Sequence, residues 1–276
     1  MLSIAPIAGG GAGYYTAQDN YYFLGSAESR WLGEGAKALG LEGAVDARQL
    51  DELIAGRLPD GTSLERMSEG KNTHRSGYDL TFSAPKSVSV LITLYGESRL
   101  LDAHNNAVEA VSREIESLVG TRVMADGIRQ QVSTGSMVAA TFNHDTSREL
   151  DPQVHTHLLL LNMTEKDGQW YTLSSDTRGR SGTIDALYDN KIALGQIYRS
   201  ELRRQVEAMG LETVSVGKHD LWEIKGVPTE QFSTRSQQIR EVAGEDASAK
   251  SRDVAALDTR QAKQKEPDRD ELLTQW

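Results

Sequence analysis

Residues 154–161 read Val-His-Thr-His followed by four leucines, a pattern that few local structures can accommodate. The two histidines, His155 and His157, are two positions apart, and residues two apart on a β-strand point to the same face. A strand here therefore presents two imidazoles side by side. The alternative is a pair of histidines that lie on a half-exposed strand and bind nothing.

A second apolar run, residues 137–142, also predicts a strand and ends next to His144. The segment between the two runs, 145–153, is polar and contains a proline, which is typical of a connection between antiparallel strands. If the two strands pair, His144 can face His155 and His157. Three neutral histidines on one side of a sheet suit a divalent ion whose remaining positions stay open for water or substrate.

Four of the nine tyrosines lie near the N-terminus, in two adjacent pairs seven residues apart. They are Tyr14, Tyr15, Tyr21 and Tyr22. A phenol has a pKa of about 10, but near a divalent cation or a base the phenolate becomes accessible and can attack phosphorus to give a covalent phosphotyrosine. Taken alone, the pattern favours tyrosines whose rings pack in the protein and whose hydroxyls contact water. Together with a three-histidine site, it favours catalysis.

Residues 78–83 alternate in polarity and predict a strand with Asp79 on its polar face. An acid there can accept the ring N–H of a metal-bound histidine, although pairing with an arginine is the alternative. The following residues predict the start of a helix with a proline in its first turn. A helix N-terminus beside Lys86 favours a phosphate.

Other elements follow from turn and periodicity signals. The segment 26–53 looks helical, and His104 lies in the apolar stripe of a helix near 100–118, so we interpret it as a packed histidine. Strands are expected at 2–7, 122–134 with a turn at Asp126-Gly127, 169–173 after the turn 166–168, and in the pair 212–216 and 221–224. A second long helix is expected at 184–209, with Ile197 inward and Lys191, Arg199, Arg203 and Arg204 outward.

Composition narrows the class of protein. The chain has 276 residues, 38% of them hydrophobic and 25% charged, which is enough for a sizeable core. The absence of cysteine excludes disulfides, thiolate metal sites and cysteine nucleophiles. A net charge of −10 argues against indiscriminate nucleic-acid binding, but it is compatible with a local basic groove. No signal peptide or membrane span is indicated, so we expect a cytoplasmic protein.

With these motifs in hand, the sequence resembles the relaxase domain of conjugative-plasmid relaxase-helicases, the TraI/TrwC or MobF family of the HUH endonuclease superfamily. The resemblance covers essentially the whole chain. It implies an α+β fold, with a central antiparallel sheet flanked by helices. It also implies a single-stranded DNA transesterase that nicks at a plasmid origin of transfer through a 5′-phosphotyrosine and can rejoin the strand.

The resemblance also implies roles for particular residues. Tyr14 matches the tyrosine that attacks first, and Tyr21 the one that acts in the later strand transfer, with Tyr15 and Tyr22 as their neighbours. The metal ligands, for Mg²⁺ or Mn²⁺, match His144, His155 and His157, and the supporting acid matches Asp79. Candidate contacts to single-stranded DNA are Lys86, Arg148, Lys191 and Arg199.

We expect a catalytic core at 1–228 and a charged helical arm at 229–276 that closes over DNA and continues into a longer polypeptide. The expected partners are origin DNA and other relaxosome and conjugation proteins, with the chain itself a monomer. One rival is a rolling-circle replication initiator, in which the histidine motif usually precedes the tyrosine. A cupin-like oxygenase would want an acid soon after His157, where the sequence has leucines. A DNA-binding module without catalysis remains open.

Overall fold

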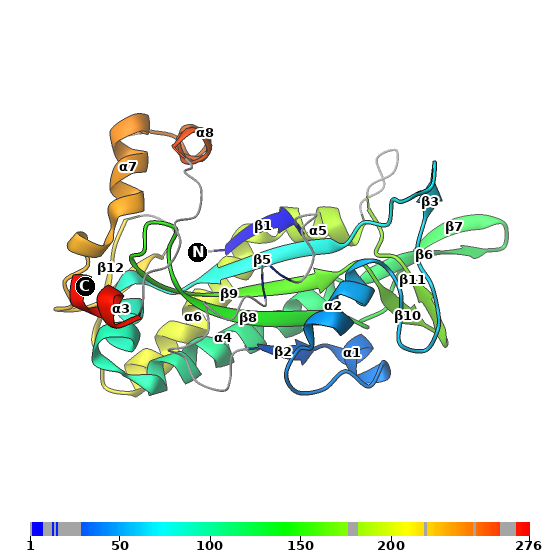
Figure 1. Cartoon of the computed structure of the whole chain (residues 1–276), viewed down its shortest axis with the longest axis horizontal. Helices are drawn as coiled ribbons and strands as arrows, with labels where there is room; N and C mark the ends of the chain where they lie inside the picture. Colours follow the sequence, from blue (N-terminus) through cyan, green and yellow to red (C-terminus); the bar gives the residue numbers. More distant parts are fainter. Residues whose placement is uncertain are drawn as a thin grey trace.

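The centre of the molecule is a five-stranded antiparallel sheet. A computed structural model of the chain describes residues 2–7, 13, 15, 29–175, 182–217, 220–244, 247–259 and 269–276. The sheet order is β1-β5-β9-β8-β2 (Figure 1). The strands are β1 (Leu2–Pro6), β2 (Ser29–Leu32), β5 (Gly77–Ser83), β8 (Ala139–Thr146) and β9 (Pro152–Leu161). Each neighbouring pair is antiparallel.

Alternate residues of β9 face two different apolar cores, which explains its unbroken leucine run. Leu158 and Leu160 pack into the larger core, together with helices that cover that side of the sheet. These helices are α3 (Lys86–Tyr95), α4 (Ser98–Ser117), α5 (Thr183–Asp189) and α6 (Lys191–Ala208). Leu159 and Leu161 belong to the smaller core on the opposite face. A strand buried on both faces needs apolar residues at every position rather than at every second one.

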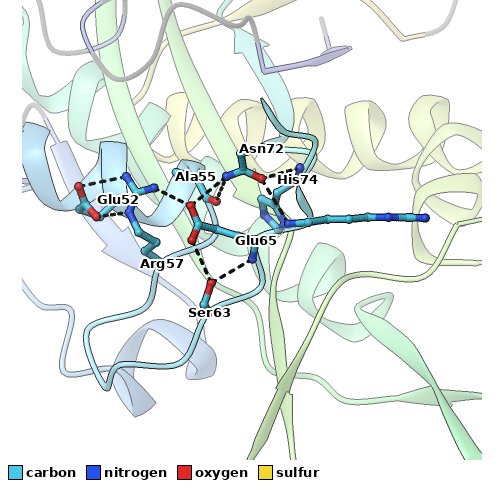
Figure 2. Close-up of polar contacts among 8 residues, drawn as sticks. Glu52, Ala55, Arg57, Ser63, Glu65, Asn72 and His74 are labelled. Carbon is cyan, nitrogen blue, oxygen red and sulfur yellow. Dashed lines mark hydrogen bonds and ion pairs between the residues drawn. The ribbon is translucent and has the colours of Figure 1, made fainter. Parts of the chain in front are cut away.

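The smaller core is covered by α1 (Glu34–Ala38) and α2 (Ala47–Ile54). The connection after α2 includes a hairpin of β3 (Met67–Ser68) and β4 (Lys71–Asn72) and is held by polar contacts (Figure 2). Arg57 bridges the carboxylates of Glu52 and Glu65. The Asn72 amide donates to the Ala55 carbonyl at 2.8 Å and accepts from the backbone N–H of His74 at 2.9 Å.

Three predicted hairpins are confirmed. They are β6 (Gly120–Ala125) with β7 (Ile128–Ser133), β10 (Thr164–Lys166) with β11 (Gln169–Tyr171), and β12 (Thr213–Ser215) with β13 (Trp222–Ile224). In the first turn Asp126 and Gly127 have φ values of 52° and 75°, and in the second Asp167 and Gly168 have 53° and 77°. Paired positive φ angles are what an Asp-Gly two-residue turn provides.

The helical interpretation of 26–53 is wrong in part. Residues 29–32 form β2, in which Trp31 pairs with Ala140 of β8. Gly33 then has a φ of 101°, and a Cβ there would lie 2.1 Å from the Met137 carbonyl oxygen, so the chain can turn into α1 only with glycine at this position. Pairing with a distant strand outweighed the local pattern, which gives no sign of it.

The long helix expected at 184–209 is two helices, because α5 ends at Asp189 and α6 begins at Lys191. Most of the side expected to face the core does so, since Leu194, Tyr198, Leu202 and Val206 are buried, but two positions differ. Ile197 is 39% exposed, whereas Arg199, expected to face outward, is only 7% exposed. Gly195, one turn earlier, lies beside its guanidinium, and a Cβ there would make an ordinary van der Waals contact of 3.6 Å with Arg199 Nη1.

Beyond residue 228 the described chain is helical, as expected. It contains the short 3₁₀ helix η3 (Glu230–Phe232), α7 (Thr234–Ala243), α8 (Ala249–Asp258) and α9 (Arg269–Gln275). Figure 1 shows α7 and α8 at the end of the molecule opposite to the β6–β7 hairpin. The Arg235 guanidinium donates to the Thr259 carbonyl at 2.9 Å and so ties α7 to the end of α8. In the part of the chain that the structure describes, no helix has the length and apolarity to cross a membrane.

Candidate metal centre and active site

Three imidazoles converge on the face of the sheet that carries the smaller core. His144 of β8 lies directly opposite His155 of β9, and Phe142 lies opposite His157. This register places all three rings on one face, where one nitrogen from each lies within 4.8 Å of the others. The predicted convergence of His144 with His155 and His157 is confirmed. Three imidazoles at this spacing, with no cysteine among them, suit a divalent transition-metal ion that keeps open positions.

Two of the rings are oriented by hydrogen bonds at Nδ1. In His155, Nδ1 lies 2.8 Å from the backbone carbonyl oxygen of Gln153. In His157, Nδ1 lies 2.8 Å from Asp79 Oδ2. Both partners are acceptors, so the neutral form of each ring has its proton on Nδ1 and its lone pair on Nε2. An imidazole in this tautomer is ready to bind a cation through Nε2.

Asp79 lies where the antiparallel register brings β5 against the histidine strand. Thr81 pairs with His157, so Asp79, two residues before it on the same face, reaches that ring. Its carboxylate also accepts from the Thr81 hydroxyl at 3.1 Å and from the Tyr15 hydroxyl at 3.2 Å. The side chain is nearly enclosed, with the residue 9% exposed. The expected bond between an acid and a metal-site histidine is present.

Tyr15 is the one tyrosine of the two N-terminal pairs that the structure describes. Its ring is 2% exposed and packs against Phe142 and, edge to face, against His157, with centroid distances of 6.0 Å and 5.4 Å. Its hydroxyl is used as a donor to Asp79. The other three tyrosines of the prediction, Tyr14, Tyr21 and Tyr22, lie outside the described residues.

Lys86 is at the start of α3, as expected, but the helix N-terminus does not offer an anion site. The carboxylate of Glu223 occupies it, accepting from the backbone N–H of Ser87 at 2.7 Å and that of Lys86 at 3.2 Å. The Lys86 ammonium donates to the Pro152 carbonyl at 2.8 Å. Burial lowers the pKa of Lys86 to about 8, against the opposing pull of Asp151 and Glu223. The expected phosphate position at this helix is taken by a carboxylate.

The remaining candidate DNA contacts do not share one environment. Arg148, in the β8–β9 connection, and Lys191, at the start of α6, are half-buried. Arg199 is buried, which corrects the expectation of an outward guanidinium.

The sequence analysis missed Thr81, whose hydroxyl donates to Asp79, although its position two residues after Asp79 on the same strand face could have indicated this contact. It also missed Gln153, whose backbone carbonyl accepts from the His155 ring. Any residue type could supply this carbonyl, so the sequence does not indicate the contact.

An antiparallel sheet flanked by helices, with three imidazoles and a supporting acid on one face and a buried tyrosine against them, is the arrangement that the resemblance to the HUH class led us to expect. Within that class the family is settled by comparison. The family model described as TrwC relaxase matches residues 8–276, and the chain belongs to that family.

Individual relatives agree with the family result. The chain is 58% identical over 266 residues to the multifunctional conjugation protein TraI of Escherichia coli strain K12, covering 96% of this chain and 15% of that protein. It thus spans a small part of the length of that relative. Two solved structures of the conjugative relaxase TrwC in complex with oriT DNA, one metal-bound and one copper-bound, match at 33% and 32% identity with TM-scores of 0.85 and 0.86. Each comparison covers 100% of this chain and 96% of the TrwC chain.

Proposed function

We propose that the chain is a relaxase that cleaves one DNA strand at a plasmid origin of transfer, remains attached through a 5′-phosphotyrosine, and can rejoin the strand. The observation that carries this proposal is the meeting of the three imidazoles, Asp79 and Tyr15 on one sheet face. The relatives support the DNA substrate, since the TrwC structures are named as complexes with oriT DNA. Family membership favours a relaxase over a rolling-circle initiator.

The metal site follows from the histidine set. His144, His155 and His157 would hold a divalent ion, Mg²⁺ or Mn²⁺ in the cell, which polarises the scissile phosphate when bound. The copper-bound TrwC structure supports a site that accepts several ions, as three neutral imidazoles would. The role of Asp79 is to fix the tautomer and direction of His157.

The covalent step is assigned to Tyr14. Its phenolate oxygen bonds to phosphorus while the bond from phosphorus to the 3′ oxygen breaks, and the released 3′ hydroxyl takes up a proton. The reverse attack by that hydroxyl rejoins the strand. We assign Tyr21 to the second strand transfer and Tyr22 to its support. Tyr15, whose buried hydroxyl donates to Asp79, steadies the acid rather than attacking phosphorus.

The DNA contacts are proposals of the same kind. Arg148 and Lys191 are half-buried cations and suit backbone phosphates. Lys86 and Arg199 remain candidates whose present hydrogen bonds or burial would have to change on binding. We further propose a catalytic core at 1–228 with a helical arm at 229–276, and action in the bacterial cytoplasm, where plasmid DNA and other conjugation proteins are found.

The proposal is tested by adduct formation. Incubation with Mn²⁺ and a single-stranded oligonucleotide that carries the origin of transfer should give a protein–DNA band that survives denaturation. Tyr14→Phe and EDTA should each abolish the band, because one removes the nucleophile and the other the cation. Tyr15→Phe is the matched control, since it removes a neighbouring hydroxyl that supports Asp79, and it should reduce the rate without abolishing the adduct.

Two outcomes would contradict the proposal. If no origin oligonucleotide gives an adduct but several bind tightly, the chain is a DNA-binding module without catalysis. If the adduct persists in Tyr14→Phe and disappears in Tyr15→Phe, the assignment of the two neighbouring tyrosines is reversed.

A further inference from the structure

A chain of buried hydrogen bonds lies on the sheet face opposite the histidine cluster. Thr156, between two of the proposed ligands, and Asn143, next to the third, both point to this opposite face. They pair directly across β8 and β9, and the Thr156 hydroxyl donates to Asn143 Oδ1 at 2.6 Å. The chain extends at both ends, to His104 of α4 and to its neighbour Asn105.

The direction of every bond in this chain can be worked out. Because the single proton of the Thr156 hydroxyl goes to Asn143, its oxygen must accept from His104 Nε2, 2.7 Å away. His104 Nδ1 then has no proton and accepts from the Tyr198 hydroxyl, also at 2.7 Å. At the other end, the Asn143 amide donates to Asn105 Oδ1 at 2.9 Å.

All the central members of this chain are withdrawn from water. His104 and Tyr198 are 0% exposed, Thr156 is 1% exposed and Asn143 is 4% exposed. Burial lowers the pKa of His104 to about 3, in keeping with the neutral ring that the hydrogen bonds require. A fully satisfied buried network specifies one arrangement, since any displacement leaves donors and acceptors unpaired in the core.

The leucines of β9 specify the pairing register of β8 and β9 less strongly than this network does. A shift of one residue would turn His155 and His157 to the wrong face. Such a shift is usually prevented by the difference between a polar and an apolar face, but all four leucines at 158–161 are fully buried. Since either face of this stretch accepts leucine, the polar pair of Thr156 with Asn143 helps to distinguish the correct register of β8 and β9 from its neighbours.

We infer that Tyr198, His104, Thr156, Asn143 and Asn105 form a positioning network, which holds β8 and β9 in the register that makes the three imidazoles converge. The network ties this register to α4 through His104 and to α6 through Tyr198. None of its members touches the ion or DNA in this role. They act through the backbone of the ligand-bearing strands.

The inference rests on the proposed metal site and is tested on metal binding alone. Thr156→Val keeps the shape of the side chain, removes the hydroxyl and leaves the His104 N–H without an acceptor. We expect its Co²⁺ affinity, measured by calorimetry, to fall about tenfold, in the range seen when groups behind metal ligands are removed. The visible absorption spectrum of bound Co²⁺ should also change, because the ligand geometry changes. Thr156→Ser, which restores the hydroxyl, should recover both.

A matched control separates positioning from loss of stability. Thr93 is equally buried and donates to the Ser89 carbonyl within α3, outside the positioning network. Thr93→Val should lower the melting temperature by a similar amount while Co²⁺ affinity and spectrum stay unchanged. If Thr156→Val does not fold, Tyr198→Phe removes only the far end of the network and should weaken Co²⁺ binding about threefold, a small part of the effect of removing such a group.

The outcomes are distinct. Unchanged Co²⁺ affinity and spectrum in the folded variants, with normal binding by the wild type, would overturn the positioning network and leave the proposed function intact. Failure of the wild type to bind Co²⁺, Mn²⁺ or Cu²⁺ would instead remove the metal centre itself.

Discussion

At the scale of single residues, Asp79 connects several parts of the site through its hydrogen bonds. It accepts from His157, Thr81 and Tyr15, and these donors come from three separate strands or segments. A carboxylate with three donors is held in one orientation, and it in turn holds the imidazole that donates to it. The acid therefore links the metal ligands to the tyrosine segment, although it binds neither metal nor DNA in the proposed scheme.

Replacing Asp79 by asparagine should weaken the metal centre. The side chain keeps its shape but loses its charge, and an amide that turns its NH₂ toward His157 favours the wrong tautomer. We expect Mn²⁺ affinity, measured by calorimetry, to fall by about 10- to 100-fold. The matched control is Glu116→Gln, since the Glu116 carboxylate accepts backbone N–H groups of Glu34 and Met137. An equal loss of affinity in both variants would contradict the assigned role of Asp79.

Much of the site was predictable residue by residue, and the failures have physical reasons. The two-residue spacing of His155 and His157, and the alternation around Asp79, gave the shared faces directly. The buried position of Arg199 was not predictable, because β1 and the Trp222 indole of β13 lie against this part of α6 and its own helix gives no sign of them. His104 was correctly interpreted as packed, but its bonds to partners 52 and 94 residues away leave no sign in its own helix.

At the scale of elements, the start of α3 shows how a helix N-terminus that favours an anion can be occupied by a carboxylate of the same chain. The sequence favours an anion at this helix N-terminus, and an anion is indeed present, but it is the Glu223 carboxylate from β13. The Ser87 hydroxyl, fully buried, donates to Glu223 and accepts from the Ile224 backbone N–H at 2.7 Å. The helix is therefore joined to the β12–β13 hairpin, and Lys86 is drawn into a partly enclosed position beside them.

The partly buried ammonium of Lys86 should make stability depend on pH. Its folded pKa of about 8 lies below the ordinary value of 10.5, so between these values the unfolded chain binds more protons and this lysine favours folding increasingly as pH rises. The unfolding free energy of Lys86→Met should therefore exceed that of the wild type. The difference should be largest at pH 7 and should shrink toward pH 10. Urea unfolding at pH 7 and pH 9.5 measures it.

The control for this experiment is an exposed lysine. Lys37 pairs with Glu34 at the surface, and its pKa is raised rather than lowered by that hydrogen bond. Lys37→Met should therefore change the unfolding free energy by the same small amount at both pH values. Parallel pH profiles for Lys86→Met and the wild type would contradict the buried, destabilised ammonium at the start of α3.

At the scale of the whole molecule, the C-terminal helices contact the connection between β8 and β9. The Trp276 indole N–H donates to the Leu150 carbonyl at 2.7 Å, and the Thr234 hydroxyl donates to Asp151 at 3.0 Å. Both acceptors lie in the β8–β9 connection, which joins two of the proposed metal ligands. A cleft of about 460 Å³ separates the arm from this connection and is lined by seven residues: Glu149, Leu150, Asp151, Gln231, Phe232, Gln275 and Trp276.

Removing the indole contact should loosen the β8–β9 connection. Trp276→Ala deletes one partly buried hydrogen bond, worth about 1 kcal/mol, and the packing of the ring. Amide hydrogen exchange in a peptide covering 147–151 should become at least fivefold faster, while exchange in the core of β9 stays the same. Trp276→Phe, which keeps a ring but has no N–H, should give an intermediate rate. Unchanged exchange at 147–151 in both variants would show that the arm does not restrain this connection.

The antiparallel pairing of β8 with β9 bears on the order in which the active site forms. His144 and His155 are joined by a short connection, so their imidazoles come together through local contacts. His157 and Asp79 are 78 residues apart, and Tyr15 and Asp79 are 64 apart, so these contacts require large loops to close. Closing larger loops costs more entropy and slows folding. We therefore expect the histidine hairpin to form before Asp79 and the tyrosine segment pack against it. If the proposed function holds, a folding chain that has bound its metal ion would not yet be competent to cleave DNA.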